Sequence, residues 1–148
     1  MDRETILAEL APCGLDCSRC FGYGDGEIKK LALALLDKLG NFDRYAGRLA
    51  KFMPVFEGYK QFHELLLFFG KASCAGCRQG GGTFPLCSAK TCFREKNVDF
   101  CFQCDEYPCE RNQFPPDLQA RWRRMNDRMR ETGVEQFYAE QKKEPRYP

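Results

Sequence analysis

The sequence predicts a mainly α-helical fold, in which a small helical bundle packs against an irregular cysteine-rich subdomain. Apolar side chains recur at helical spacing in the two longer segments that lack cysteine. Ten cysteines among 148 residues fall into three short groups instead of being spread along the chain. This length fits one domain, so we expect residues 1–148 to form a single domain large enough to bury a core.

The segment 25–70 is expected to hold the first helices. Its opening apolar stripe predicts a helix with Asp25 at the N-cap and Gly40 just past the end. That stripe consists of Ile28, Leu31, Leu35, Leu36 and Leu39. Aromatic residues and leucines continue at similar spacing over 42–52 and 56–69, which predicts two more helices.

The segment 117–141 predicts the C-terminal helices. The stripe of the first is formed by Leu118, Trp122, Met125 and Met129. Pro116 opens this helix and Gly133 ends it, and a short apolar pattern after Gly133 predicts a second helix. Residues 142–148 are expected to fray.

The cysteines define a hook over 13–20 and a loop region over 72–111. The hook carries a C-x3-C-x2-C motif, and the loop region opens with C-x2-C and ends with C-x2-C-x4-C. Glycine and proline recur in the loop region without a helical stripe, so we expect loops with one or two short strands. The ten cysteines are Cys13, Cys17, Cys20, Cys74, Cys77, Cys87, Cys92, Cys101, Cys104 and Cys109.

Close cysteine pairs in a reducing compartment are most often metal ligands. The N-terminus lacks the pattern of a secretory signal, and no apolar run approaches the ~20 residues of a membrane span, so we expect a cytoplasmic protein without membrane contact. Two C-x2-C pairs can supply a tetrahedral zinc site of the four-thiolate, zinc finger-like type. We therefore predict a zinc-binding subdomain, two zinc ions, and all ten cysteines as candidate ligands.

The pairing of these ligands is left open by the sequence. Local grouping places one zinc ion within the loop region and a second between the hook and the last cysteine group. These two sets are Cys74, Cys77, Cys87 and Cys92, and Cys17, Cys20, Cys101 and Cys104. Cys13 and Cys109 would then be spare or would exchange with their neighbours, and interleaved pairings fit equally well.

Closed sites of four thiolates are typical of structural zinc, because catalytic zinc keeps an open coordination position. We therefore expect a non-enzymatic module, without catalytic residues, that acts in regulation or in interaction with a protein partner. The alternative is an iron–sulfur or thiol-based protein of redox chemistry or metal handling, since thiolates hold both kinds of metal centre.

Two other features are expected to be structural. His63 lies near the apolar stripe of a predicted helix, so we expect a half-buried structural histidine and not a ligand or a general base. Trp122 shares an apolar stripe and is expected to pack inward, which leaves the arginines around it on a solvated or protein-docking face. They are Arg121, Arg123, Arg124, Arg128 and Arg130. Nucleic acid is therefore not expected as a partner.

Three motifs together resemble a known family. They are CGLDCSRC at 13–20, CAGCR at 74–78 and CFQCDEYPCE at 101–110. The combination is similar to the prokaryotic family called domain of unknown function 3795, and the resemblance covers nearly the whole chain. The chain departs from the family at Phe84, where many relatives have cysteine, and at Ala89-Lys90, where many have Ile-Arg. The resemblance implies a cysteine-rich, metal-binding protein with no assigned activity.

Overall fold

The computed structural model describes residues 2–82 and 84–147 and is mainly helical, as predicted. This described part holds seven α-helices and three short 3-10 helices, and its β-type pairing is one isolated bridge between Leu10 and Asp16. The chain divides into two compact units. Phe21–Ser73 form the hairpin unit, and Met1–Cys20 with Cys74–Pro148 form the cysteine unit. The helices are therefore divided between two units, where one bundle was expected.

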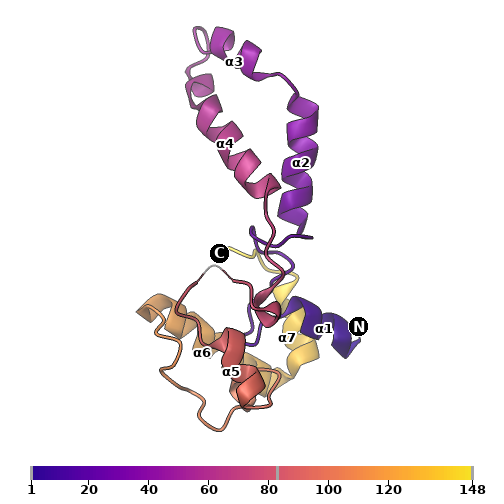
Figure 1. Ribbon diagram of the computed structural model, residues 1–148, viewed down its shortest axis with the longest axis vertical. Helices are drawn as coiled ribbons and strands as arrows, with labels where there is room; N and C mark the ends of the chain where they lie inside the picture. Colours follow the sequence, from indigo (N-terminus) through magenta and orange to yellow (C-terminus); the bar gives the residue numbers. More distant parts are fainter. Residues whose placement is uncertain (1, 83, 148) are drawn as a thin grey trace. The chain divides into compact units, whose positions relative to one another are not determined.

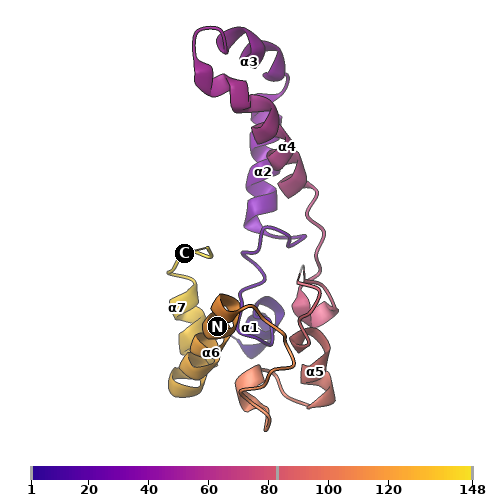
Figure 2. The same ribbon diagram turned by 90° about the vertical axis from the view of Figure 1, so that its left-hand side faces the viewer.

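The hairpin unit consists of two longer helices joined by shorter helical turns. Its elements are α2 (Glu27–Leu39), α3 (Asp43–Leu49), η1 (Pro54–Gly58) and α4 (Tyr59–Gly70). Helices α2 and α4 run side by side in both views (Figures 1 and 2). They approach closely at Gly70, where an added Cβ atom would lie 3.1 Å from Leu33 and 3.6 Å from Leu36. Helix α2 ends before Gly40 as predicted, but its N-cap is Gly26 and not Asp25.

The cysteine unit is built on α1 (Arg3–Glu9), α6 (Pro116–Thr132) and α7 (Val134–Gln141). Gly133 separates α6 from α7 with a φ of +85°, which favours glycine, so the predicted boundary is confirmed. Helix α1 was not predicted; it is short, and Asp2 caps it by accepting a hydrogen bond from the amide of Thr5 at 2.8 Å. The apolar core of this unit consists of Ile6, Leu10, Phe100, Met125, Met129, Phe137 and Tyr138.

The region 72–111 contains short helices where loops and strands were expected. Its elements are η2 (Cys77–Gln79), α5 (Ala89–Glu95) and η3 (Cys101–Gln103), and its described residues include no strand. The start of α5 is fixed by Asn112, whose buried side-chain oxygen accepts a hydrogen bond from the amide of Ala89 at 3.0 Å. Phe84 packs against Phe114, with ring centres 5.5 Å apart.

Residues 142–147 of the C-terminal tail are held against the hook, where fraying over 142–148 was expected; residue 148 lies outside the described residues. The Nε atom of Arg146 donates to the carbonyl of Asp16 at 3.0 Å, and Nη1 of Arg19 donates to the carbonyl of Glu144 at 2.7 Å. None of the helices in the described ranges is long and apolar enough to cross a membrane.

Candidate metal centre

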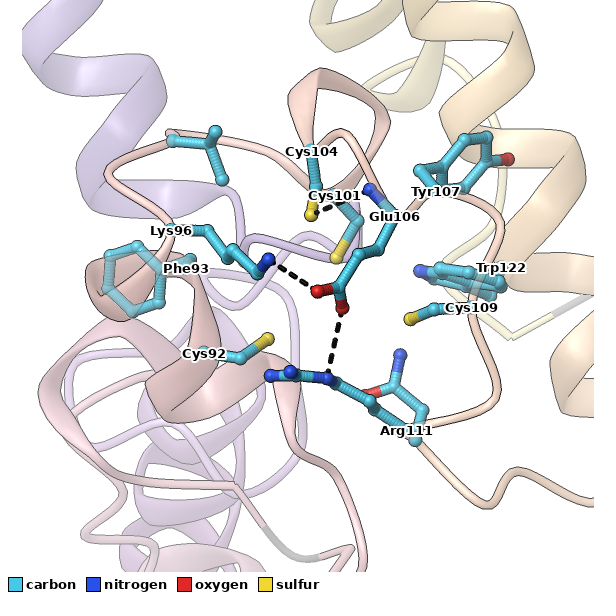
Figure 3. Close-up of a pocket in the computed structure, with 12 residues that line it drawn as sticks. Cys92, Phe93, Lys96, Cys101, Cys104, Glu106, Tyr107, Cys109, Arg111 and Trp122 are labelled. Atoms are coloured by element: carbon cyan, nitrogen blue, oxygen red, sulfur yellow. Dashed lines mark hydrogen bonds and ion pairs between the residues drawn. The ribbon is translucent and has the colours of Figure 1, made fainter.

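Four cysteines line one small cavity of the cysteine unit. Cys92 comes from α5, Cys101 from η3, and Cys104 and Cys109 from the loop that follows (Figure 3). The cavity measures about 20 Å³, which is room for one water-sized particle. We call it the four-cysteine pocket. Its size suits a single ion.

The charged side chains at this pocket form ion pairs with one another. The carboxylate of Glu106 points between the sulfur atoms (Figure 3), 2.5 Å from Nζ of Lys96 and 3.1 Å from Nε of Arg111. Burial and the nearby Cys109 raise the pKa of the Cys92 thiol, and Arg111 counters part of this effect. The two cations therefore neutralise Glu106 at this pocket, and Arg111 also favours the thiolate form of Cys92.

Trp122 supplies a buried donor to the four-cysteine pocket. Its side chain is 1% exposed, and its Nε1–H has no well-aligned hydrogen-bond partner among the residues that the structure describes. The nitrogen faces the pocket (Figure 3) and lies near enough to Cys101 to lower the pKa of that thiol, although burial and Cys13 raise it overall. A buried N–H without a partner costs free energy, so this donor fits a pocket that holds thiolate or metal-bound sulfur.

A second group of thiols centres on a contact between the hook and the loop region. The thiol of Cys77 hydrogen-bonds Cys17, which lowers the pKa of Cys17 to about 7 and raises that of Cys77. Cys13 and Cys87 lie close enough to raise the pKa of Cys77 further, and burial raises the pKa of Cys13 to about 12. Opposite shifts of this kind indicate one shared proton between Cys17 and Cys77.

Cys74 is surrounded by glycine backbone. Its sulfur accepts hydrogen bonds from the amides of Gly76 at 3.4 Å and Gly82 at 3.2 Å. A Cβ atom at Gly81 would lie 2.6 Å from this sulfur, so the close wrapping of the loop requires glycine there. Backbone amides that point at a cysteine sulfur are typical of the surroundings of a metal-bound sulfur.

The structure therefore groups the cysteines differently from the local pairing. Cys92 faces Cys101, Cys104 and Cys109, and Cys109, expected to be spare, lines the pocket. Across residues 2–82 and 84–147, no three Cys, His, Asp or Glu side chains are spaced closely enough to hold an ion as they stand. Binding an ion would have to draw these sulfur atoms together.

Two buried polar side chains that the sequence did not single out hold the cysteine loops in place. The amide nitrogen of Asn126 donates to the carbonyls of Cys13 and Trp122, both at 2.9 Å, and its oxygen accepts from the amide of Phe102 at 3.0 Å. The carboxylate of Asp16 is fully buried in the hook. A polar residue four positions after Trp122 within an apolar stripe is the signal that could have revealed Asn126.

The histidine and the arginines take structural positions. His63 is half-buried in α4, and its ring stacks on Tyr59 with ring centres 6.0 Å apart. Trp122 packs inward as predicted. Arg128 and Arg130 of α6 form ion pairs on the surface, including one of 2.7 Å between Arg128 and Glu140.

These features define a small, mainly helical protein whose thiols converge in one unit. The chain belongs to the family described as Protein of unknown function (DUF3795), whose sequence profile matches residues 9–114. This range includes all ten cysteines, and it confirms the family resemblance carried by the three motifs. No curated protein and no solved structure matches the chain.

Proposed function

We propose that the protein binds metal through its cysteine thiolates, with one ion held by Cys92, Cys101, Cys104 and Cys109. The observation that supports this most directly is their convergence on a cavity of about 20 Å³. Four thiolates without histidine suit zinc in a closed tetrahedral site. The buried N–H of Trp122 would give the bound sulfur a donor, and Arg111 would offset part of the negative charge on Cys92.

A second ion would bind at the contact between Cys17 and Cys77. Each of these belongs to a C-x2-C pair, which offers Cys20 and Cys74 as further ligands. The thiols of Cys13 and Cys87, which also lie near Cys77, are the alternative pair of remaining ligands. With either pair of ligands, the second ion would link the hook to the loop region.

The role we propose for both ions is structural, in a cytoplasmic interaction or regulatory module. A closed site of four thiolates has no open coordination position, which is typical of structural and not of catalytic zinc. The thiols must also stay reduced to bind metal, which the cytoplasm provides.

The test is metal analysis of the full chain purified without oxygen. We expect a colourless protein with two equivalents of zinc, and X-ray absorption with four sulfur neighbours at ~2.3 Å. Iron with acid-labile sulfide and visible absorption would instead identify an iron–sulfur protein. Absence of bound metal together with disulfides would contradict metal binding altogether.

Two variants locate the first ion. Cys104→Ser should reduce the zinc content by one equivalent, because it removes one of four ligands. Glu106→Gln is the matched control at the same pocket: it removes the carboxylate charge and should keep the ion if thiolates alone bind it. Equal loss of zinc in both variants would show that Glu106 is a ligand and that the all-cysteine site is wrong.

A further inference from the structure

The hairpin unit carries an apolar face that its own residues leave open. Leu31 and Leu35 of α2 are 61% and 41% exposed, and Phe62 and Leu65 of α4 are 42% and 56% exposed. The two leucines of α2 are four residues apart and the two residues of α4 are three apart, so each pair forms a stripe along its helix. A helix normally turns such a stripe toward a core.

Both stripes lie on the same side of the hairpin. Leu36 lies toward α4, where it approaches Gly70, and Leu66 is a buried residue of α4. Leu35 directly precedes Leu36, and Leu65 directly precedes Leu66. Because each residue of an α-helix turns by about 100°, each of these side chains points about 100° away from the α2–α4 interface, in the same sense about its own helix axis. In an antiparallel pair of helices, equal rotations away from the shared interface point to the same side. The stripes therefore merge into one face.

This face has the apolar area of a standard protein interface. With Phe68 at its edge, which is 59% exposed, its side chains present roughly 500 Å² of apolar surface, near the upper limit for a monomer. A standard interface buries about 800 Å² per partner, of which rather more than half is apolar. The face therefore supplies the apolar part of one such interface.

We infer that a second copy of this chain covers this face, so that two hairpin units form a four-helix bundle. Two antiparallel helices of 13 and 12 residues make half of such a bundle, and a two-fold axis would place each stripe against its equivalent. The face has leucine and phenylalanine at its centre, and the hairpin unit carries acidic and basic residues in near balance. This suits self-association better than binding to a strongly charged partner.

The test is sedimentation velocity of the full chain over a range of concentrations. We expect a dimer that dissociates on dilution. Leu65→Glu places a charge on the face and should shift the midpoint of dissociation by at least tenfold in concentration. Leu67→Glu is the matched control, because Leu67 is 39% exposed and lies two positions further, on the opposite side of α4; it should leave the dimer intact.

Far-UV circular dichroism and zinc content of the same samples separate loss of association from loss of folding. If Leu65→Glu does not fold, the milder Leu65→Ser replaces it. A wild-type chain that stays monomeric at about 100 µM would overturn the inference, as would equal effects of the two glutamate variants. Because this inference does not depend on metal, a dimer without zinc would refute only the proposed function, and a zinc-loaded monomer would refute only the dimer.

Discussion

Replacing Asp16 by asparagine should destabilise the cysteine unit by about 2–3 kcal/mol. The carboxylate is fully buried and accepts four hydrogen bonds of 2.7–3.0 Å from Ser18, Arg19 and Lys142. Removing one member of a buried ion pair costs about 3–5 kcal/mol. The side chains of Arg19 and Lys142 keep 20% and 30% of their exposure, so water can solvate them partly and we take a value below this range.

The assay is thermal unfolding followed by tryptophan fluorescence. Trp122 is the one tryptophan of the sequence and lies in the cysteine unit, so its emission reports on this unit alone. We expect the midpoint to fall by roughly 10–20 °C, given about 4–8 °C per kcal/mol for a unit of this size. Glu131→Gln is the matched control in the same unit: its side chain is 69% exposed in α6, and loss of its charge should change the stability by less than about 0.5 kcal/mol.

The dependence on pH gives the second part of this test. Burial alone would raise the pKa of Asp16, but hydrogen bonds from Ser18, Arg19 and Lys142 outweigh it and lower the pKa below the ordinary 3.8. The Asp16 carboxylate therefore contributes its full stabilisation at pH values above its ordinary pKa of 3.8. This stabilisation is lost as the pH falls from 3.8 through the lowered pKa of the folded state. The difference between wild type and Asp16→Asn should close in acid. A difference that stays constant to pH 2, or no difference at pH 7, would refute the reasoning.

Three further predictions concern the candidate metal centre. Gly81→Ala should lower the zinc content measured by mass spectrometry, because its Cβ atom would lie 2.6 Å from the sulfur of Cys74; Gly47→Ala, with nothing within 4 Å, should not. Trp122→Phe removes the donor but keeps most of the ring, so zinc should dissociate more readily in a chelator competition while the fold is retained. Removing metal with a chelator should increase hydrogen exchange in 74–111 more than in α2 or α4; uniform exchange would contradict this.

The longer helices could be predicted from the sequence because each carries its own signal. The apolar stripes of α2, α4 and α6 repeat over several turns, so their positions do not depend on the rest of the fold. Helices α1 and α5 have seven residues each, and each buries a single residue, so no stripe exists to be read. Their ends are fixed by particular hydrogen bonds, such as the one that the amide of Ala89 in α5 donates to Asn112, which only the folded chain makes.

The grouping of the cysteines could not be predicted, because sequence distance is a poor guide to spatial distance in loops. Cys92 and Cys87 are five residues apart, yet Cys92 lines the four-cysteine pocket while Cys87 lies near Cys77. The difference arises because Cys92 lies in the last turn of α5, whereas Cys87 precedes the helix. A grouping by neighbours ignores this helix and joins the two cysteines to the same ion.

The two hydrophobic clusters of the cysteine unit explain why metal should stabilise its cysteine loops more than its helices. The first consists of seven buried side chains, none of which is a cysteine; they come from α1, α6 and α7, from Leu10 just after α1, and from Phe100 of the loop region. The second consists mainly of small residues and thiols around Trp122, including Cys13, Cys17 and Cys101. Thiols and alanines bury little apolar area, so this cluster gains less from the hydrophobic effect than the first. Metal bonds would supply the missing stabilisation to the cysteine loops, while the three helices keep the first cluster, to which the loop region contributes Phe100.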